Sequence, residues 1–126
     1  MHNYKELQIW QHSGKLVKKI YQITKIFPDT ERFSLVTQMQ RCAVSIPSNI
    51  AKGSGKSSDK VFIRFLEIAI SSVFELETQL ILANDLEFIS ENETKIISQK
   101  LEEIQIMIFG FEKKLKNQNL SINHES

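Results

Sequence analysis

The sequence is poor in the residues that staple small proteins or interrupt helices. Cys42 is its single cysteine, so the chain can form neither an internal disulfide nor a cysteine zinc cluster. Only two prolines and four glycines occur in 126 residues, and no segment alternates apolar and polar side chains beside a hairpin turn. There is also no apolar run near the roughly 18 residues of a membrane span, and no secretory signal pattern. We therefore expect a cytoplasmic protein built from helices, with no membrane contact.

The stretch GSGKSS at 53–58 is reminiscent of a nucleotide-binding loop. A P-loop requires a glycine five positions before its Gly-Lys-Ser, placed between a buried strand and a helix. Here that position is Ile50, and the preceding segment has helical periodicity. We interpret the stretch as a connector that ends one helix near Gly53 and caps the next at Ser57 or Ser58.

Other catalytic and metal-binding patterns are also missing. The closely spaced glutamates, such as Glu75 and Glu77, are not three or four residues apart and do not meet on one helix face. Cys42 lies on an apolar side, which favours a packed residue over a nucleophile. No metal-ligand spacing joins the histidines, which are His2, His12 and His124. We expect no catalytic residues, no metal and no cofactor.

The spacing of apolar residues predicts four long helices, at about 5–27, 29–51, 58–83 and 90–117. Because their connections are short, neighbouring helices are expected to run antiparallel. The predicted fold is an all-α, antiparallel up-down four-helix bundle over residues 1–117. Residues 118–126 are mostly polar and are expected to form a flexible tail.

The second predicted helix carries a polar seam opposite its apolar side. Pro47 interrupts this helix, removes one N–H and frees the carbonyl of Ala43, so a bend is expected unless other groups compensate. The seam is either exposed to solvent or a strip that forms hydrogen bonds or faces a ligand. Its residues are Ser34, Gln38, Arg41, Ser45, Asn49 and Lys52.

The third predicted helix has two apolar stripes rather than one. The main stripe includes Phe62, Leu66, Val73 and Leu80, which is sufficient for one side of a bundle core. One core does not readily cover the second stripe as well, so we expect copies of the chain to associate through it. The second stripe, and thus the predicted oligomer interface, comprises Ile63, Ile70, Phe74 and Ile81.

The charges are unevenly distributed along the chain. Residues 1–64 carry eleven Lys and Arg against four Asp and Glu, whereas residues 65–126 carry five against eleven, giving +7 and −6 and a net charge of +1. A basic side of a folded domain attracts polyanions such as nucleic acids. The candidate nucleic-acid-binding residues are Lys15, Lys18, Lys19, Arg41, Lys52, Lys56, Lys60 and Arg64.

Three stretches resemble the bacterial four-helix-bundle family that includes the 23S rRNA intervening-sequence proteins, and more distantly the accessory variability determinant of diversity-generating retroelements. The resemblance covers about residues 4–115 and implies an up-down bundle assembled as a homopentamer, with the retroelement relative binding nucleic acid and a reverse transcriptase. The family usually has Glu at the position of Lys52, so no role that needs a carboxylate there carries over. The stretches are YKELQIWQ, FPDTERFSLVTQMQRCAVSIPSNIAKGSG and KVFIRFLEIAISSVFELETQLILA.

Together these features predict a non-enzymatic cyclic homo-oligomer that binds RNA or other nucleic acid through a repeated basic surface. The alternative is a protein-interaction scaffold or accessory subunit that touches no nucleic acid. A third interpretation, a nucleotide-using enzyme, depends on GSGKSS alone.

Overall fold

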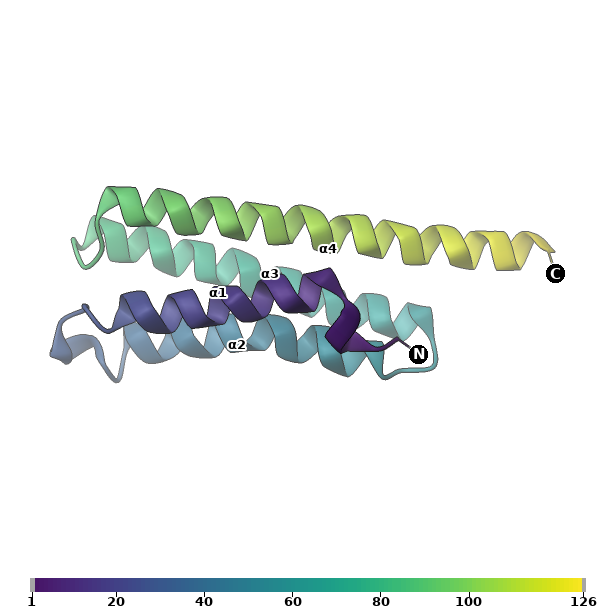
Figure 1. Ribbon diagram of the computed structural model, residues 1–126, viewed down its shortest axis with the longest axis horizontal. Helices are drawn as coiled ribbons and strands as arrows, with labels where there is room; N and C mark the ends of the chain where they lie inside the picture. The colour runs from purple at the N-terminus through teal and green to yellow at the C-terminus, as the bar shows by residue number, and fades with distance from the viewer. Residues whose placement is uncertain (1, 126) are drawn as a thin grey trace.

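The chain folds into four long helices that lie side by side (Figure 1). A computed structural model describes the backbone of residues 2–125 and the side chains of residues 2–118. The helices are α1 (Gln8–Thr24), α2 (Leu35–Ser54), α3 (Asp59–Asp85) and α4 (Glu91–Glu125). Two single-turn 3-10 helices, η1 (Tyr4–Glu6) and η2 (Asp29–Glu31), precede α1 and α2. Residues 2–125 contain no strand, which confirms the predicted all-α, four-helix class.

Helices that follow one another in the chain are also neighbours in space. The contact between α2 and α3 is the most extensive, and that between α1 and α4 is the smallest of those between adjoining long helices. In the α2–α3 contact, the thiol of Cys42 donates to the carbonyl of Ser72 at 3.0 Å, and Gly53 lies against Phe62. Late residues of α2 therefore meet early residues of α3. At its C-terminal end, α4 extends past the other three helices (Figure 1).

A single apolar core runs between the helices and accounts for most of their sequence periodicity. Each fully buried large side chain contributes on the order of 1.5–3 kcal/mol of gross transfer free energy, which explains why the amphipathic stripes determine the packing. The largest of these side chains come from all four helices: Leu16, Ile20, Met39, Ile46, Ile50, Phe62, Leu66, Leu76, Leu80, Ile97, Leu101 and Ile108.

The second apolar stripe of α3 divides into two pairs. Ile63 and Ile70 are only 9% and 6% exposed within the subunit, whereas Phe74 and Ile81 are 45% and 50% exposed. The prediction that one subunit leaves the whole stripe uncovered is therefore wrong for Ile63 and Ile70. Because α3 packs against both α2 and α4, its buried arc is wider than one stripe.

Helix α2 passes through Pro47 and remains one helix from Leu35 to Ser54. One turn around the proline is reinforced by Asn49, whose side-chain amide donates to the carbonyl of Ser45 at 2.8 Å and to its hydroxyl at 3.0 Å. Helix α2 was expected to end near Gly53, and it ends one residue later, at Ser54. Gly53 is therefore inside the last turn, where it packs against Phe62.

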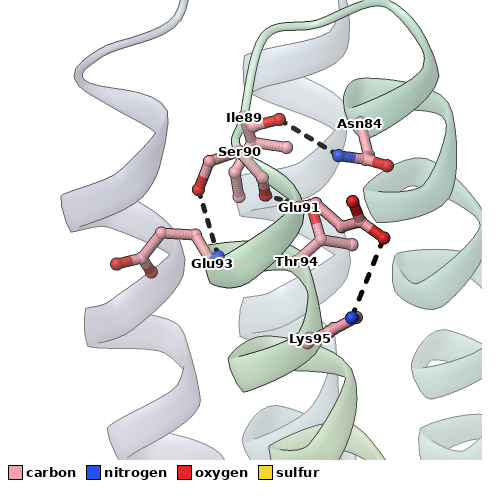
Figure 2. Close-up of polar contacts among 7 residues, drawn as sticks. All are labelled: Asn84, Ile89, Ser90, Glu91, Glu93, Thr94 and Lys95. Carbon is pink, nitrogen blue, oxygen red and sulfur yellow. Dashed lines mark hydrogen bonds and ion pairs between the residues drawn. The ribbon is translucent and has the colours of Figure 1, made fainter.

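The connection from α3 to α4 is fixed by local hydrogen bonds (Figure 2). The side-chain amide of Asn84 donates to the carbonyl of Ile89 at 3.2 Å, and the hydroxyl of Ser90 accepts from the backbone N–H of Glu93 at 3.1 Å. Ser90 is thus an N-cap with Glu three residues later. The carboxylate of Glu93 turns away from Ser90 (Figure 2) and pairs with Lys19 of α1 at 3.3 Å, which ties the start of α4 to α1.

The C-terminal end of α4 differs from the expectation. A helix end was predicted near Asn117, but the backbone of residues 118–125 continues α4. The flexibility expected of residues 118–126 stays a prediction. Ser126 lies outside the described residues.

Candidate nucleic-acid interface

Two of the four helices carry basic residues and no acidic residue. Helix α1 contains Lys15, Lys18 and Lys19, helix α2 contains Arg41 and Lys52, and neither contains Asp or Glu. Helices α1 and α2 lie side by side (Figure 1) and form one face of the bundle. All the charged side chains that these two helices contribute to that face are positive.

An open hollow of about 510 Å³ lies over the outer side of α2, with one residue contributed by α1. It holds two cations and one aromatic ring, and no acidic residue lines it. The remaining lining residues mostly have neutral side chains that form hydrogen bonds. We call it the α2 hollow, and it is lined by Tyr21, Thr37, Gln40, Arg41, Val44, Ser45, Ser48, Asn49 and Lys52.

The polar seam of α2 has two roles in the structure. Its middle part joins helices, because the hydroxyls of Ser45 and Ser72 lie 2.8 Å apart and Asn49 donates to Ser45. Arg41 and Lys52 remain exposed and line the α2 hollow. The seam is therefore part hydrogen-bonded strip and part exposed basic surface.

A second hollow, of about 370 Å³, adjoins the first, since Thr37 and Gln40 line both. It adds two cations, one acid and Phe33, which is 89% exposed. We call the two hollows together the α1–α2 groove. The second hollow is lined by Thr24, Lys25, Phe27, Pro28, Asp29, Arg32, Phe33, Val36, Thr37 and Gln40.

The three lysines predicted on α1 differ in their surroundings. Lys18 is exposed and lines neither hollow, but it lies three residues before Tyr21, so the two side chains share one side of α1. Lys15 is exposed but does not line the groove. Lys19 is half-buried in its ion pair with Glu93, which engages its charge within the subunit.

The remaining predicted cations lie around the α2–α3 connection. The ammonium of Lys56 is 5.6 Å from the ring centroid of Phe65, and Lys60 and Arg64 are exposed on α3. At the start of α3 the hydroxyl of Ser58 already accepts from a backbone N–H, and Asp59 places a carboxylate in the first turn. Lys56 and Lys60 line neither hollow, so they do not join Arg41 and Lys52 in one site.

The sequence reasoning missed two cations and two exposed aromatic rings of the groove, which are Lys25, Arg32, Tyr21 and Phe33. Tyr21 lies within an apolar stripe of the predicted first helix and therefore resembled a core residue. Phe33 is a single aromatic within the polar stretch DTERFS, and such an isolated ring between two helices was the available signal.

Cys42 is buried, as expected for a packed thiol. Burial, together with the nearby carboxylate of Glu75, raises the pKa of the Cys42 thiol from its ordinary 9.0 to about 12. A thiol with that pKa holds its proton at neutral pH and is a poor nucleophile.

Among the residues that the structure describes, no three His, Cys, Asp or Glu side chains gather closely enough to hold a metal ion. Within the same residues, no helix has the length and apolar character needed to cross a bilayer.

The model of the 23S rRNA-intervening sequence protein family matches residues 5–110. The chain belongs to this family. The matched range includes α1, α2, α3 and the first part of α4, and thus every residue of the α1–α2 groove. The family assignment made from the sequence stretches is confirmed.

One solved structure shares the fold of this family member. It is the crystal structure of a protein of unknown function from the S23 ribosomal protein family of Bacteroides thetaiotaomicron, with a TM-score of 0.77 and 24% sequence identity. The match covers 83% of this chain and 98% of that chain, so it supports the helical architecture over nearly the whole relative. A search of curated proteins finds no match to this chain.

Proposed function

We propose that this member of the 23S rRNA-intervening sequence protein family is a non-enzymatic, oligomeric helical bundle that binds RNA or other nucleic acid through the α1–α2 groove. The observation that carries the proposal is the charge of this face. Helices α1 and α2 contain five basic residues and no acid, and Arg41 and Lys52 project into one hollow. Phosphate contacts by such residues supply most of the affinity in binding that is independent of sequence.

The proposal includes the assembly. We expect an antiparallel, up-down bundle that forms a cyclic homo-oligomer, with the homopentamer implied by the family resemblance. Gly53, near the end of α2, lies against Phe62, early in α3, whereas Cys42, earlier in α2, is bonded to Ser72, further along α3. This reversed order of contacts supports the antiparallel arrangement. The exposed pair Phe74 and Ile81 is the proposed contact between copies. A ring would repeat the groove, and several modest sites on one rigid body bind a long polyanion through avidity.

The test is the salt dependence of RNA binding. In the triple variant Lys18→Gln, Arg41→Gln and Lys52→Gln, the plot of log affinity against log salt becomes flatter by about 0.7 for each lost contact to a single-strand phosphate. The matched control removes three exposed lysines of α4, Lys100, Lys113 and Lys114, by the same substitution. Equal slopes for wild type and the groove variant, or an equal loss in the control, would reject the groove as the interface.

Exposed apolar residues support a second candidate, a scaffold for a protein partner. Ile26 is 68% exposed and Phe33 is 89% exposed near the α1–α2 connection, and Leu86 is 58% exposed at the α3–α4 connection. Such residues gain free energy when a partner covers them. A stable protein complex recovered by pull-down, together with no salt-sensitive RNA binding, would favour the scaffold over the nucleic-acid binder.

A further inference from the structure

We infer that the α1–α2 groove takes a single-stranded nucleic acid, and that Tyr21 and Phe33 are the surfaces on which its unpaired bases stack. The inference rests on the proposed function and narrows it from nucleic acid in general to an unpaired strand.

The two rings are in position for this role. Tyr21 is 43% exposed in the α2 hollow, and Phe33 is the most exposed large apolar side chain in the described part of the chain. Phe33 lines the adjoining hollow. Within the described side chains neither ring takes part in an aromatic pair, whereas Phe62 and Phe111 are paired in the bundle, with ring centroids 5.4 Å apart. Tyr21 and Phe33 therefore present faces that the fold itself does not use.

Cations accompany each ring. Arg41 and Lys52 line the hollow that contains Tyr21, and Lys25 and Arg32 line the hollow that contains Phe33. Four cations thus face one acid along the groove, Asp29. A positively charged groove interspersed with exposed aromatic rings is the arrangement that binds single strands with little sequence preference.

The dimensions of the groove suit a short stretch of strand. The part of α2 that lines the groove, from Val36 to Lys52, rises about 24 Å at about 1.5 Å per residue. A stacked strand advances about 3.4 Å per nucleotide, so this length corresponds to about seven nucleotides. Arg41 and Lys52, about 16 Å apart along the same helix, would contact different phosphates rather than one.

The rings distinguish a single strand from a duplex. In a duplex the base faces are stacked on one another, so exposed aromatic rings find no base and the cations alone contribute. An unpaired strand places phosphates at the cations and base faces on the rings at the same time. Thr37, Gln40 and Ser48 line the groove between these groups and can hydrogen-bond to base edges or sugar hydroxyls.

The experiment compares three ligands of equal length by fluorescence anisotropy at fixed salt: an unstructured 12-nucleotide RNA, the same RNA annealed to its complement, and an abasic ribose-phosphate 12-mer. Wild-type protein should bind the single strand more tightly than the other two. Tyr21→Ala and Phe33→Ala should each lower the affinity for the single strand about tenfold. Neither substitution should change the affinity for the abasic strand. Tyr21→Phe should restore wild-type affinity, since it retains the ring.

Phe109→Ala is the matched control, because this aromatic is 46% exposed on α4, outside the groove. It should leave RNA affinity unchanged, with the molecular mass of each variant verified by light scattering. Equal affinity for the single, duplex and abasic strands would overturn the stacking inference and leave the proposed function intact. No binding to any of the three would overturn the proposed function itself. If Phe33→Ala changed the molecular mass or abolished a protein complex while RNA affinity stayed constant, Phe33 would belong to a protein interface and the inference would fail.

Discussion

Gly53 of α2 lies directly against Phe62 of α3. A Cβ atom at Gly53 would be 2.6 Å from Cδ1 of Phe62 and 2.8 Å from Cβ of Phe65. Real Cβ atoms do not approach other atoms so closely, and the Phe62 ring is itself buried in the core. The absence of a side chain at Gly53 therefore allows the end of α2 to meet the start of α3, and the first glycine of GSGKSS has a packing role.

Gly53→Ala should lower the free energy of unfolding by about 1–3 kcal/mol, the usual cost of overpacking a core. Urea denaturation monitored by circular dichroism measures it. Gly14→Ala is the matched control, since a Cβ built there meets nothing within 4 Å beyond the adjacent backbone of α1, which is helical at that position. Gly14→Ala should raise the free energy of unfolding by about 0.5–1 kcal/mol, because alanine has a higher helix propensity than glycine. Equal stabilities for Gly53→Ala and wild type would contradict the close approach of α2 and α3.

Substitutions along the second stripe of α3 should separate folding from assembly. Phe74→Glu places a charge at an exposed position, so the subunit should stay folded and the oligomer should dissociate. Ile70→Glu places the same charge at a position only 6% exposed in the subunit, so the helices should unfold. Light scattering and circular dichroism distinguish the two outcomes. An unchanged mass for Phe74→Glu would show that the interface lies elsewhere.

The fold was predictable because it is encoded locally. Periodicity placed the four helices, and Ser58, one of the two caps predicted for the third helix, accepts from the backbone N–H of Val61. The extent of burial on α3 was not predictable, because it depends on which neighbours pack against both sides of that helix. Ile63 and Ile70 have the same sequence pattern as Phe74 and Ile81, yet only the first pair is covered within the subunit.

The candidate site was predictable in its charge and not in its shape. Arg41 and Lys52 were identified because they are cations on a polar seam, and both line the α2 hollow. Tyr21 was missed because it lies on an apolar stripe of the first helix, and periodicity assigns such residues to a core. Phe33 was missed although it is an isolated ring in the polar stretch DTERFS. Lys19 was indistinguishable from Lys18 in sequence, and only the packing of α4 against α1 reveals its partner Glu93.

This difference between Lys18 and Lys19 gives a paired prediction. Lys18→Gln should weaken RNA binding and leave stability unchanged, because Lys18 is exposed beside Tyr21. Lys19→Gln should leave RNA affinity nearly unchanged and lower the free energy of unfolding by less than about 1 kcal/mol, since its partly exposed ion pair is weak. Anisotropy and urea denaturation measure the two effects. Equal losses of RNA affinity would mean that the Glu93 pair does not withhold Lys19 from the ligand.

Cys42 predicts how stability changes at alkaline pH. The folded thiol keeps its proton up to a pKa of about 12, whereas the unfolded thiol loses it near the ordinary 9.0. The folded state therefore binds more protons between these values, and stability falls as the pH rises through this window, by up to about 1.4 kcal/mol per pH unit. Below pH 9 the contribution is fully present. To isolate the contribution of the thiol, the measurement is the difference between wild type and Cys42→Ala in urea denaturation at several pH values. The variant lacks the thiol, so its stability should fall less steeply as the pH rises.

Parallel pH profiles for the two proteins would mean that Cys42 ionises as easily in the folded chain as in the unfolded one, which contradicts its burial between Ser72 and Glu75.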